Sequence, residues 1–219
     1  PDFGYPPVQY GGWLAPRARW YTKTAAHNTV SVDGQDTKPC TGKTTLWFDG
    51  KEFHVVRATA PALIGGRQFE RTLMLVDISE TDSYVVDILR VAGGREHTRF
   101  THGHFGGLET TGLSAAPLTE TRYGEVMRNF QRDPKPSPGW SATWKVNDHL
   151  KYLPAGSEVH LRLTDLTRDV EVQRAESWVA VGLYGGTAEA WIPSLLVRRQ
   201  ATNAPLTSTF VSVIEPYAS

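Results

Sequence analysis

The chain has 219 residues, enough to bury a substantial hydrophobic core, and its 23 basic residues balance its 23 acidic residues. This balance excludes a general electrostatic attraction to nucleic acid or to an anionic membrane surface, so no nucleic-acid partner is predicted. Cys40 is the only cysteine, which excludes an internal disulfide and a cysteine-rich metal centre.

No apolar run reaches the roughly 18 residues of a membrane-spanning helix, and no basic-then-apolar leader opens the chain. The sequence therefore predicts no membrane span. It begins without Met on a segment rich in Gly, Pro and Tyr, residues 1–21, which we expect to be irregular and to belong to a longer protein.

Beyond Tyr21 the dominant pattern is alternation of apolar and polar residues, which is typical of β-strands. The first strand is predicted within 27–34. Asp49-Gly50 then lies between two alternating runs and predicts a tight hairpin, in which Leu46 and Phe48 face Phe53 and Val55.

Further alternating runs follow, most of them separated by Gly, Pro, Asn or Asp. They predict strands within 67–77, 84–94, 96–106, 141–146, 158–166, 169–176, 177–185, 189–200 and 208–217. The segment 131–140 contains three prolines and is predicted to be a long loop. About ten to twelve short strands predict an all-β fold, a two-layer antiparallel β-sandwich that forms one domain over 1–219.

His27 stands at the start of the first predicted strand, where alternation places it with Thr29 and Ser31, opposite the valines. A surface or hydrogen-bonded histidine is the simpler interpretation. Asp2 adds a second one, because a carboxylate and an imidazole together suit Zn²⁺, which binds both at about 2.0–2.2 Å. Zinc needs three or four protein ligands, so at least one more must come from elsewhere.

His102 and His104 are two positions apart, so the alternation of a strand predicts that they lie on one face. Such a pair can chelate a metal or bind an acidic sugar, although a strand bounded by glycine turns is the alternative. His54, His149 and His160 are predicted to be structural or solvated. No nucleophile, phosphate-loop or dinucleotide motif is present.

Aromatic residues are the other candidates for binding, because their faces can stack on sugar rings. Tyr5, Tyr10, Trp13 and Trp20 lie in the irregular first 21 residues, where a binding role and a core role are both open.

The segment "DFGYP", followed by "TAAHNTVSVDGQ", resembles the C-terminal part of heparinase II/III-like polysaccharide lyases. The resemblance implies that an α/α toroid precedes this β-sandwich in a parent enzyme. It also implies cleavage of acidic, uronate-containing polysaccharide by β-elimination, with the catalytic acid and base mainly on the toroid. On this basis the chain alone is predicted to be inactive, and the parent to be periplasmic or secreted.

The resemblance also implies site roles. Asp2 and His27 would be two of the three ligands of a structural zinc or similar divalent metal, with the third on a strand before residue 1. Asn28, His102 and His104 are the candidate substrate-binding residues. The alternatives are a non-catalytic carbohydrate-binding β-sandwich and a purely structural accessory domain.

Overall fold

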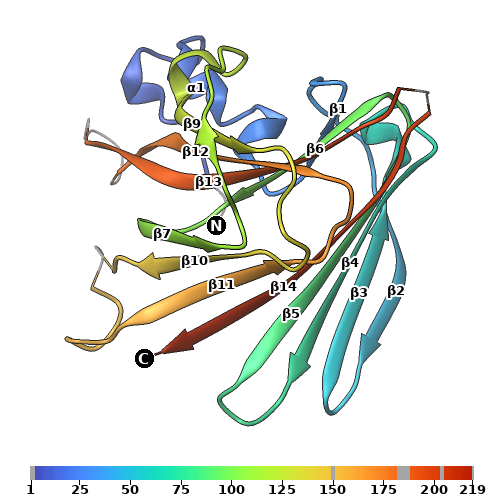
Figure 1. The fold of residues 1–219 in the computed structure, drawn as a ribbon, viewed down its shortest axis with the longest axis vertical. Coiled ribbons are helices and arrows are strands. Elements are labelled where there is room, and N and C mark those ends of the chain that lie inside the picture. Colours follow the sequence, from blue (N-terminus) through green and yellow to red (C-terminus); the bar gives the residue numbers. More distant parts are fainter. Residues whose placement is uncertain (1–2, 149–150, 182–187, 203–204, 219) are drawn as a thin grey trace.

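The computed structural model describes residues 3–148, 151–181, 188–202 and 205–218. In these ranges fourteen strands form two antiparallel sheets, as the alternating sequence pattern predicts (Figure 1). None of the helices in the described ranges is long and apolar enough to cross a bilayer.

The larger sheet has eight strands in the order β2-β3-β4-β5-β14-β11-β10-β7. Their bounds are β2 Lys43–Asp49, β3 Phe53–Thr59, β4 Gln68–Asp77, β5 Ser83–Ala92, β14 Thr207–Ala218, β11 Val159–Asp165, β10 Ser141–Val146 and β7 Gly106–Thr111. In sequence, β3 to β5 form a meander, and a short 3₁₀ helix, η3 (Pro61–Leu63), connects β3 to β4.

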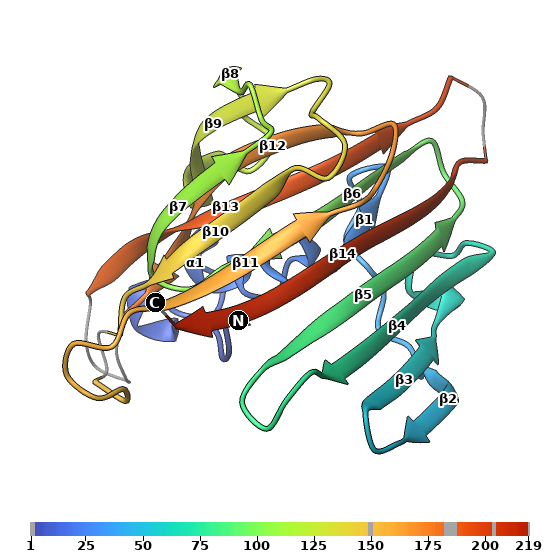
Figure 2. The same ribbon diagram turned by 60° about the horizontal axis from the view of Figure 1, so that its bottom comes forward.

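The smaller sheet has six strands in the order β1-β6-β13-β12-β9-β8. Their bounds are β1 Val30–Val32, β6 Glu96–His102, β13 Glu189–Gln200, β12 Glu171–Ala180, β9 Met127–Asp133 and β8 Ala116–Pro117, with the 3₁₀ helix η4 (Gly124–Val126) before β9. Figures 1 and 2 show strands β2 to β5 extending past the end of this smaller sheet, which covers only part of the larger one.

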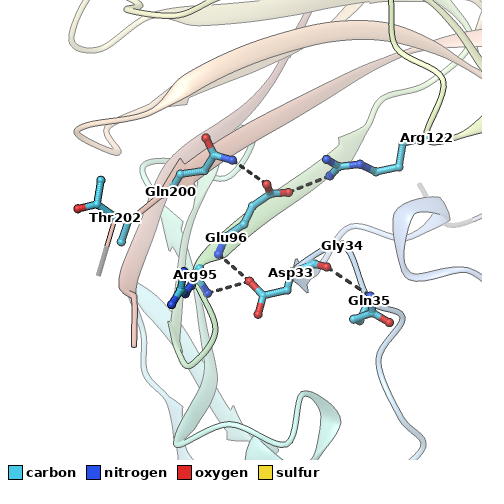
Figure 3. A pocket seen from close by; sticks show the side chains of 9 residues that line it. Asp33, Gly34, Gln35, Arg95, Glu96, Arg122, Gln200 and Thr202 are labelled. Atoms are coloured by element: carbon cyan, nitrogen blue, oxygen red, sulfur yellow. Dashed lines mark hydrogen bonds and ion pairs between the residues drawn. The ribbon is translucent and has the colours of Figure 1, made fainter. Parts of the chain in front are cut away.

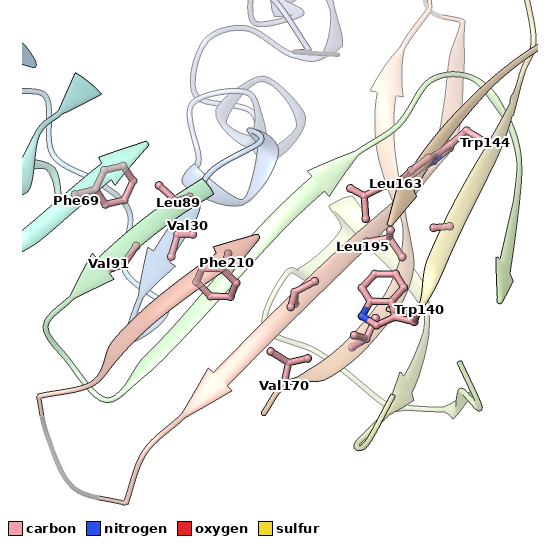
Figure 4. Close-up of a cluster of buried hydrophobic side chains, with 13 residues drawn as sticks. Val30, Phe69, Leu89, Val91, Trp140, Trp144, Leu163, Val170, Leu195 and Phe210 are labelled. Atoms are coloured by element: carbon pink, nitrogen blue, oxygen red, sulfur yellow. The ribbon is translucent and has the colours of Figure 1, made fainter. Parts of the chain in front are cut away.

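The main core lies where the two sheets overlap (Figure 4). Strand alternation directs one side chain in two to this interface, and large residues from both sheets fill it. Its completely or almost completely buried members include Trp144, Leu89, Val91, Leu195 and Phe210.

A second hydrophobic cluster lies on the outer face of the smaller sheet, beneath the N-terminal segment. That segment contains three short helices, η1 (Val8–Tyr10), α1 (Pro16–Trp20) and η2 (Thr24–Ala26). Trp20 and Tyr21 pack with Phe100 and Trp178 of the sheet. The smaller sheet is therefore covered on both faces, which explains why it carries so few exposed apolar residues.

The interior also contains charge. Asp87 of β5 is fully buried and accepts two hydrogen bonds from Arg71, of 2.9 and 2.6 Å, and one of 2.9 Å from Arg99 of the opposite sheet. Arg99 also donates to Ser212 Oγ at 2.8 Å. Because a lone buried charge is costly, these residues form a unit in which each group depends on the others.

The predicted hairpin is present, but its turn is displaced by one residue. Asp49 is still in β2 and pairs with His54, so residues 50–52 form the connection. Phe48 pairs with Val55 and stacks on Phe53 at 4.9 Å between ring centroids, in line with the predicted apolar contacts.

Three predictions about strand boundaries are wrong. A single strand, β12, continues through the predicted boundary between the runs 169–176 and 177–185, because no turn interrupts its pairing with β13. Residues 131–133 belong to β9 instead of the proline-rich loop, since each proline comes after Asp133. The strand predicted within 96–106 ends at His102. Strands β7, β8 and β9 were missed because their residues alternate weakly.

Candidate functional site

The candidate site lies where the N-terminal segment meets the end of β6. Two hydrogen bonds attach this segment to β12: Trp20 Nε1 donates to the Trp178 carbonyl at 3.1 Å, and Tyr21 Oη accepts from the Ala180 N–H at 2.9 Å. Tyr21 is also 5% exposed. Because both partners are buried aromatics, the backbone that leads to His27 is held in one position.

His27 follows η2 directly and precedes β1, which starts only at Val30. Its Nε2 lies 3.0 Å from the carbonyl oxygen of Tyr21. A carbonyl can only accept, so Nε2 donates this hydrogen bond, and in the neutral imidazole the lone pair then lies on Nδ1. Metal-binding histidines commonly donate their second ring N–H to a backbone carbonyl in this way, so the arrangement fits a ligand role through Nδ1.

Asn28 is held from two sides. Its Oδ1 accepts from the backbone N–H of His102 at 2.7 Å, and its own carbonyl accepts from Arg71 Nη1 at 2.7 Å. The Asn28 side chain thus helps to hold the end of β6, and a substrate contact by Asn28 stays a prediction.

His102 is buried. Its exposed fraction is 2%, its Nδ1 lies 2.8 Å from Ser194 Oγ, and its Nε2 donates to the Ala25 carbonyl at 2.8 Å. Phe3 covers the imidazole, with ring centroids 4.8 Å apart. The sequence-based prediction that His102 contacts substrate is therefore not supported, because its ring nitrogens serve to join η2 to β13.

His104 lies beyond the end of β6, so the two histidines do not form the predicted same-face pair on one strand. Strand β6 ends directly before Gly103, where an added Cβ would come within 1.9 Å of the Trp144 side chain. His104 is half-buried against Phe105, and its Nδ1 has no hydrogen-bond partner among the described residues. A substrate contact by His104 stays a prediction.

Asp2 lies outside the described residues. Its neighbour Phe3 packs against the rings of Trp20, Tyr21 and His102, with centroid distances of 6.0, 5.5 and 4.8 Å. Within the described part of the chain, no three His, Cys, Asp or Glu side chains gather into a group that could hold a metal. Zinc binding by Asp2 and His27 thus stays a prediction.

The N-terminal aromatic residues divide into two kinds. Trp20 is 3% exposed and belongs to the second hydrophobic cluster, so it is a core residue. Tyr10 packs edge-on against Trp178 at 5.0 Å. Tyr5 and Trp13, which are 57% and 58% exposed, contact each other edge-to-face at 5.4 Å. Only this last pair presents aromatic surface to a ligand.

Two adjoining cavities open beside the segment 33–36. One, of about 660 Å³, is lined by Trp20, Lys23 and Tyr123 among others. The other, of about 730 Å³, lies around Asp33, Glu96 and Arg122 (Figure 3). Both include Gly34, Gln35 and Arg122.

Ion pairs largely neutralise the charges in these cavities. Lys23 contacts Asp36 at 2.7 Å, and Arg122 contacts Glu96 at 2.8 Å. Burial would raise the pKa of Glu96, but hydrogen bonds from Arg198, Arg122 and Gln200 outweigh it, so the pKa is lowered. Arg19 lines the smaller cavity and Arg95 the larger one, and neither forms an ion pair among the described residues, so some positive charge is left in both cavities.

His54 has no predicted partner in the sequence, where the expectation is a structural or solvated histidine. The structure places it between two carboxylates: Nδ1 contacts Asp49, and Nε2 lies 3.1 Å from Asp77. The hydrogen bond with Asp49 outweighs partial desolvation and, with Asp77, raises the pKa of His54. Both aspartates end their strands, a signal visible in the sequence only once the three strands are known to be neighbours.

No protein-family model matches this sequence, and no curated protein does. Solved structures do match its fold. A heparinase III superposes with a TM-score of 0.67 at 14% identity, over 99% of this chain and 28% of that one. The heparan sulfate lyase HepC of Pedobacter heparinus superposes with a TM-score of 0.60 at 18% identity, over 100% of this chain and 28% of that one. The chain thus has the fold of a region of these lyases and spans little more than a quarter of their length.

Proposed function

We propose that this chain is the β-sandwich portion of a polysaccharide lyase that cleaves acidic, uronate-containing polysaccharide by β-elimination. The observation that carries the proposal is the superposition of the whole chain on a heparinase III and on a heparan sulfate lyase. The "DFGYP" and "TAAHNTVSVDGQ" segments give it independent support, because they provide the carboxylate and the imidazole of a metal site.

The first role we propose for the chain is to hold a structural divalent metal, such as zinc, through Asp2 and His27. His27 is suited to this because its Nε2–H is engaged by the Tyr21 carbonyl, which fixes the ring and presents Nδ1. When bound, the metal would cross-link the start of the chain to the segment before β1. Two ligands are too few for zinc, so the parent protein would supply a third.

The second role is to form one wall of the substrate cleft. Elimination requires a base that removes the proton next to the uronate carboxylate, an acid for the leaving oxygen, and a group that neutralises the carboxylate. Lys23 and Arg122 in the two cavities are held in ion pairs with Asp36 and Glu96, and the resemblance to heparinase II/III-like lyases implies that the acid and base lie mainly on the toroid. We therefore assign the catalytic groups to the remainder of the parent, an α/α toroid, and expect this chain alone to be inactive.

The test uses the full-length parent and its His27→Ala variant. We expect the variant to lose bound metal and lyase activity, the latter followed by the ultraviolet absorbance of the unsaturated product on a panel of uronate polymers. His160→Ala is the matched control, because His160 stacks on Tyr217 in the larger sheet, away from this site. Normal metal content in the His27→Ala protein would refute the ligand assignment, and an inactive wild-type parent across the panel would refute the lyase assignment.

One observation favours a second function, a non-catalytic carbohydrate-binding module. Tyr5 and Trp13 form an exposed aromatic pair of the type that stacks on sugar rings. If this function is correct, the 219-residue chain binds oligosaccharide by itself, and Trp13→Ala abolishes the binding. The resemblance to heparinase II/III-like lyases also supports a location of the parent protein in the periplasm or outside the cell.

A further inference from the structure

The surface that motivates this inference is the end of the larger sheet that the smaller sheet does not cover, formed by β2, β3, β4 and the start of β5. We call it the uncovered end (Figures 1 and 2). Six large hydrophobic side chains with substantial exposure gather here within 33 positions of the sequence: Leu46, Trp47, Phe48, Phe53, Leu75 and Ile78. They lie on both faces of the sheet, with Trp47 and Leu75 on one face and Leu46, Phe48 and Phe53 on the other. Exposed apolar surface of this kind is typical of an interaction surface.

Strand register shows which of these side chains face the core side of the sheet. Phe69 pairs with Val91, and both belong to the main core. Alternation along β4 puts Leu73 and Leu75 on the same side as Phe69. Leu73 pairs with Val56, and Val56 pairs with Trp47.

The core face therefore continues past the smaller sheet as an apolar strip that ends at Trp47, which is 74% exposed. On the same face, Leu75 pairs with His54 and His54 pairs with Asp49, so the apolar strip borders directly on the charged end of the hairpin.

The rim of the strip is acidic. The two hairpin tips at this end, 49–52 and 77–82, carry five acidic residues and one basic residue, Lys51. The acidic residues are Asp49, Glu52, Asp77, Glu80 and Asp82. The backbone N–H of Asp77 donates to the Glu52 carbonyl at 2.9 Å, which holds the two tips together. Like charge repels an acidic polysaccharide, so this rim does not suit the proposed substrate.

The outermost strand strengthens the case for a protein partner. β2 is an edge strand whose seven residues are all exposed. No strand in the described part of the chain pairs with its second edge, and Trp47 and Phe48 lie on its opposite faces. Proteins cover or charge such edges to prevent association with other strands, and the residues of β2 at this point are apolar.

We propose that the uncovered end is the surface on which the rest of the parent protein docks, through an apolar patch with a basic rim that covers Trp47 and faces the acidic hairpin tips. This rests on the proposed function, in which the chain is about a quarter of a longer enzyme. A second copy of the chain is the competing occupant. The assignment also separates two surfaces: the uncovered end binds protein, and polysaccharide binds elsewhere.

The first test is covalent footprinting of Trp47 in the 219-residue chain and in the full-length parent, with free tryptophan added as the dose reference. We expect the labelling rate of Trp47 to fall several-fold in the parent, since an exposed indole becomes covered. Equal labelling in the two proteins would overturn the proposal. Protection in the isolated chain that grows with its concentration would also overturn it, in favour of the second copy.

The second test compares Trp47→Glu in the two proteins. In the 219-residue chain the change should leave the unfolding midpoint nearly unchanged, because the side chain is already mostly exposed. In the parent it should lower the midpoint, since a carboxylate would be buried beside an acidic rim. Tyr152→Glu is the control, because Tyr152 is 82% exposed and lies on the loop between β10 and β11. No change in the parent would contradict the docking surface.

These readouts do not depend on catalysis. A parent that protects Trp47 but has no lyase activity would retain the docking surface and lose the proposed function. A parent that has lyase activity but leaves Trp47 unprotected would support the proposed function and refute the docking surface.

Discussion

The two halves of the larger sheet differ in what covers them, and the difference accounts for most of the behaviour expected of this protein. Where the smaller sheet lies over it, the larger sheet buries aromatic residues and even charge, with Asp87 enclosed by Arg71 and Arg99. At the uncovered end, the same alternation of residues leaves Trp47 exposed and His54 between two carboxylates. An identical local pattern thus produces a core in one half and an interface in the other.

The largest expected effect comes from removing the charge inside the covered half. Asp87→Ala leaves two arginines facing a fully buried, empty position, so we expect it to lower the free energy of unfolding by roughly 3–5 kcal/mol. Lys145→Ala, which breaks an exposed pair with Glu158, should cost less than about 1 kcal/mol. Denaturant unfolding of both variants measures the contrast, and similar losses would contradict it.

Apolar truncations should sharpen the same contrast. Phe210 is fully buried in the main core, and Phe210→Ala should cost about 3–5 kcal/mol through lost burial and the cavity left behind. Phe53→Ala, at the uncovered end, removes a ring that is 40% exposed and should cost about half as much or less. If the two losses in the isolated chain were equal, the uncovered end would have to be packed there as tightly as the core.

The smallest effect is a difference in the sign of pH dependence between two histidines. Burial lowers the pKa of His97, which lies near Asp33 and Arg199 and bonds to Gly93 and Ser208. Its folded-state pKa is below the unfolded value of about 6.5, so the stability it contributes is present above that pH and is lost as the pH falls.

His54 has the opposite sign, because Asp49 and Asp77 raise its pKa. Its contribution is present below about pH 6.5 and is lost as the pH rises through the raised folded-state value. Unfolding of His97→Gln and His54→Gln across pH 5 to 8 should remove these two dependences separately. NMR titration of the two imidazoles provides a direct check, and pKa values displaced in the same direction would contradict the assignment.

Much of the fold could be predicted because alternation and turn residues act locally. The strand Ser141–Val146 and the strand Glu189–Gln200 have the predicted bounds, the second in spite of Pro193, which the ladder accommodates. Strand β9 was missed because its sequence is mostly polar and its burial comes from neighbours far along the chain.

The site was less predictable because it depends on contacts between distant residues. The alternation that correctly separated strands could not show that the strand ends before Gly103, where Trp144 leaves no space for a side chain. For the same reason the sequence could not show that His102, which is predicted with His104 to bind a metal or an acidic sugar, is a buried connector between η2 and β13. The position of His54 between two aspartates requires the order of three strands, which no single segment encodes.

Arg71 connects the interior of the sandwich to the segment before β1, because its guanidinium contacts both the Asp87 carboxylate and the Asn28 carbonyl. The segment that contains His27 and Asn28 is therefore linked through Arg71 to the buried carboxylate of Asp87. If His27 holds the proposed metal, substitutions deep in the sandwich should change metal affinity and folding together, so a screen for metal retention would also select for a well-formed interior.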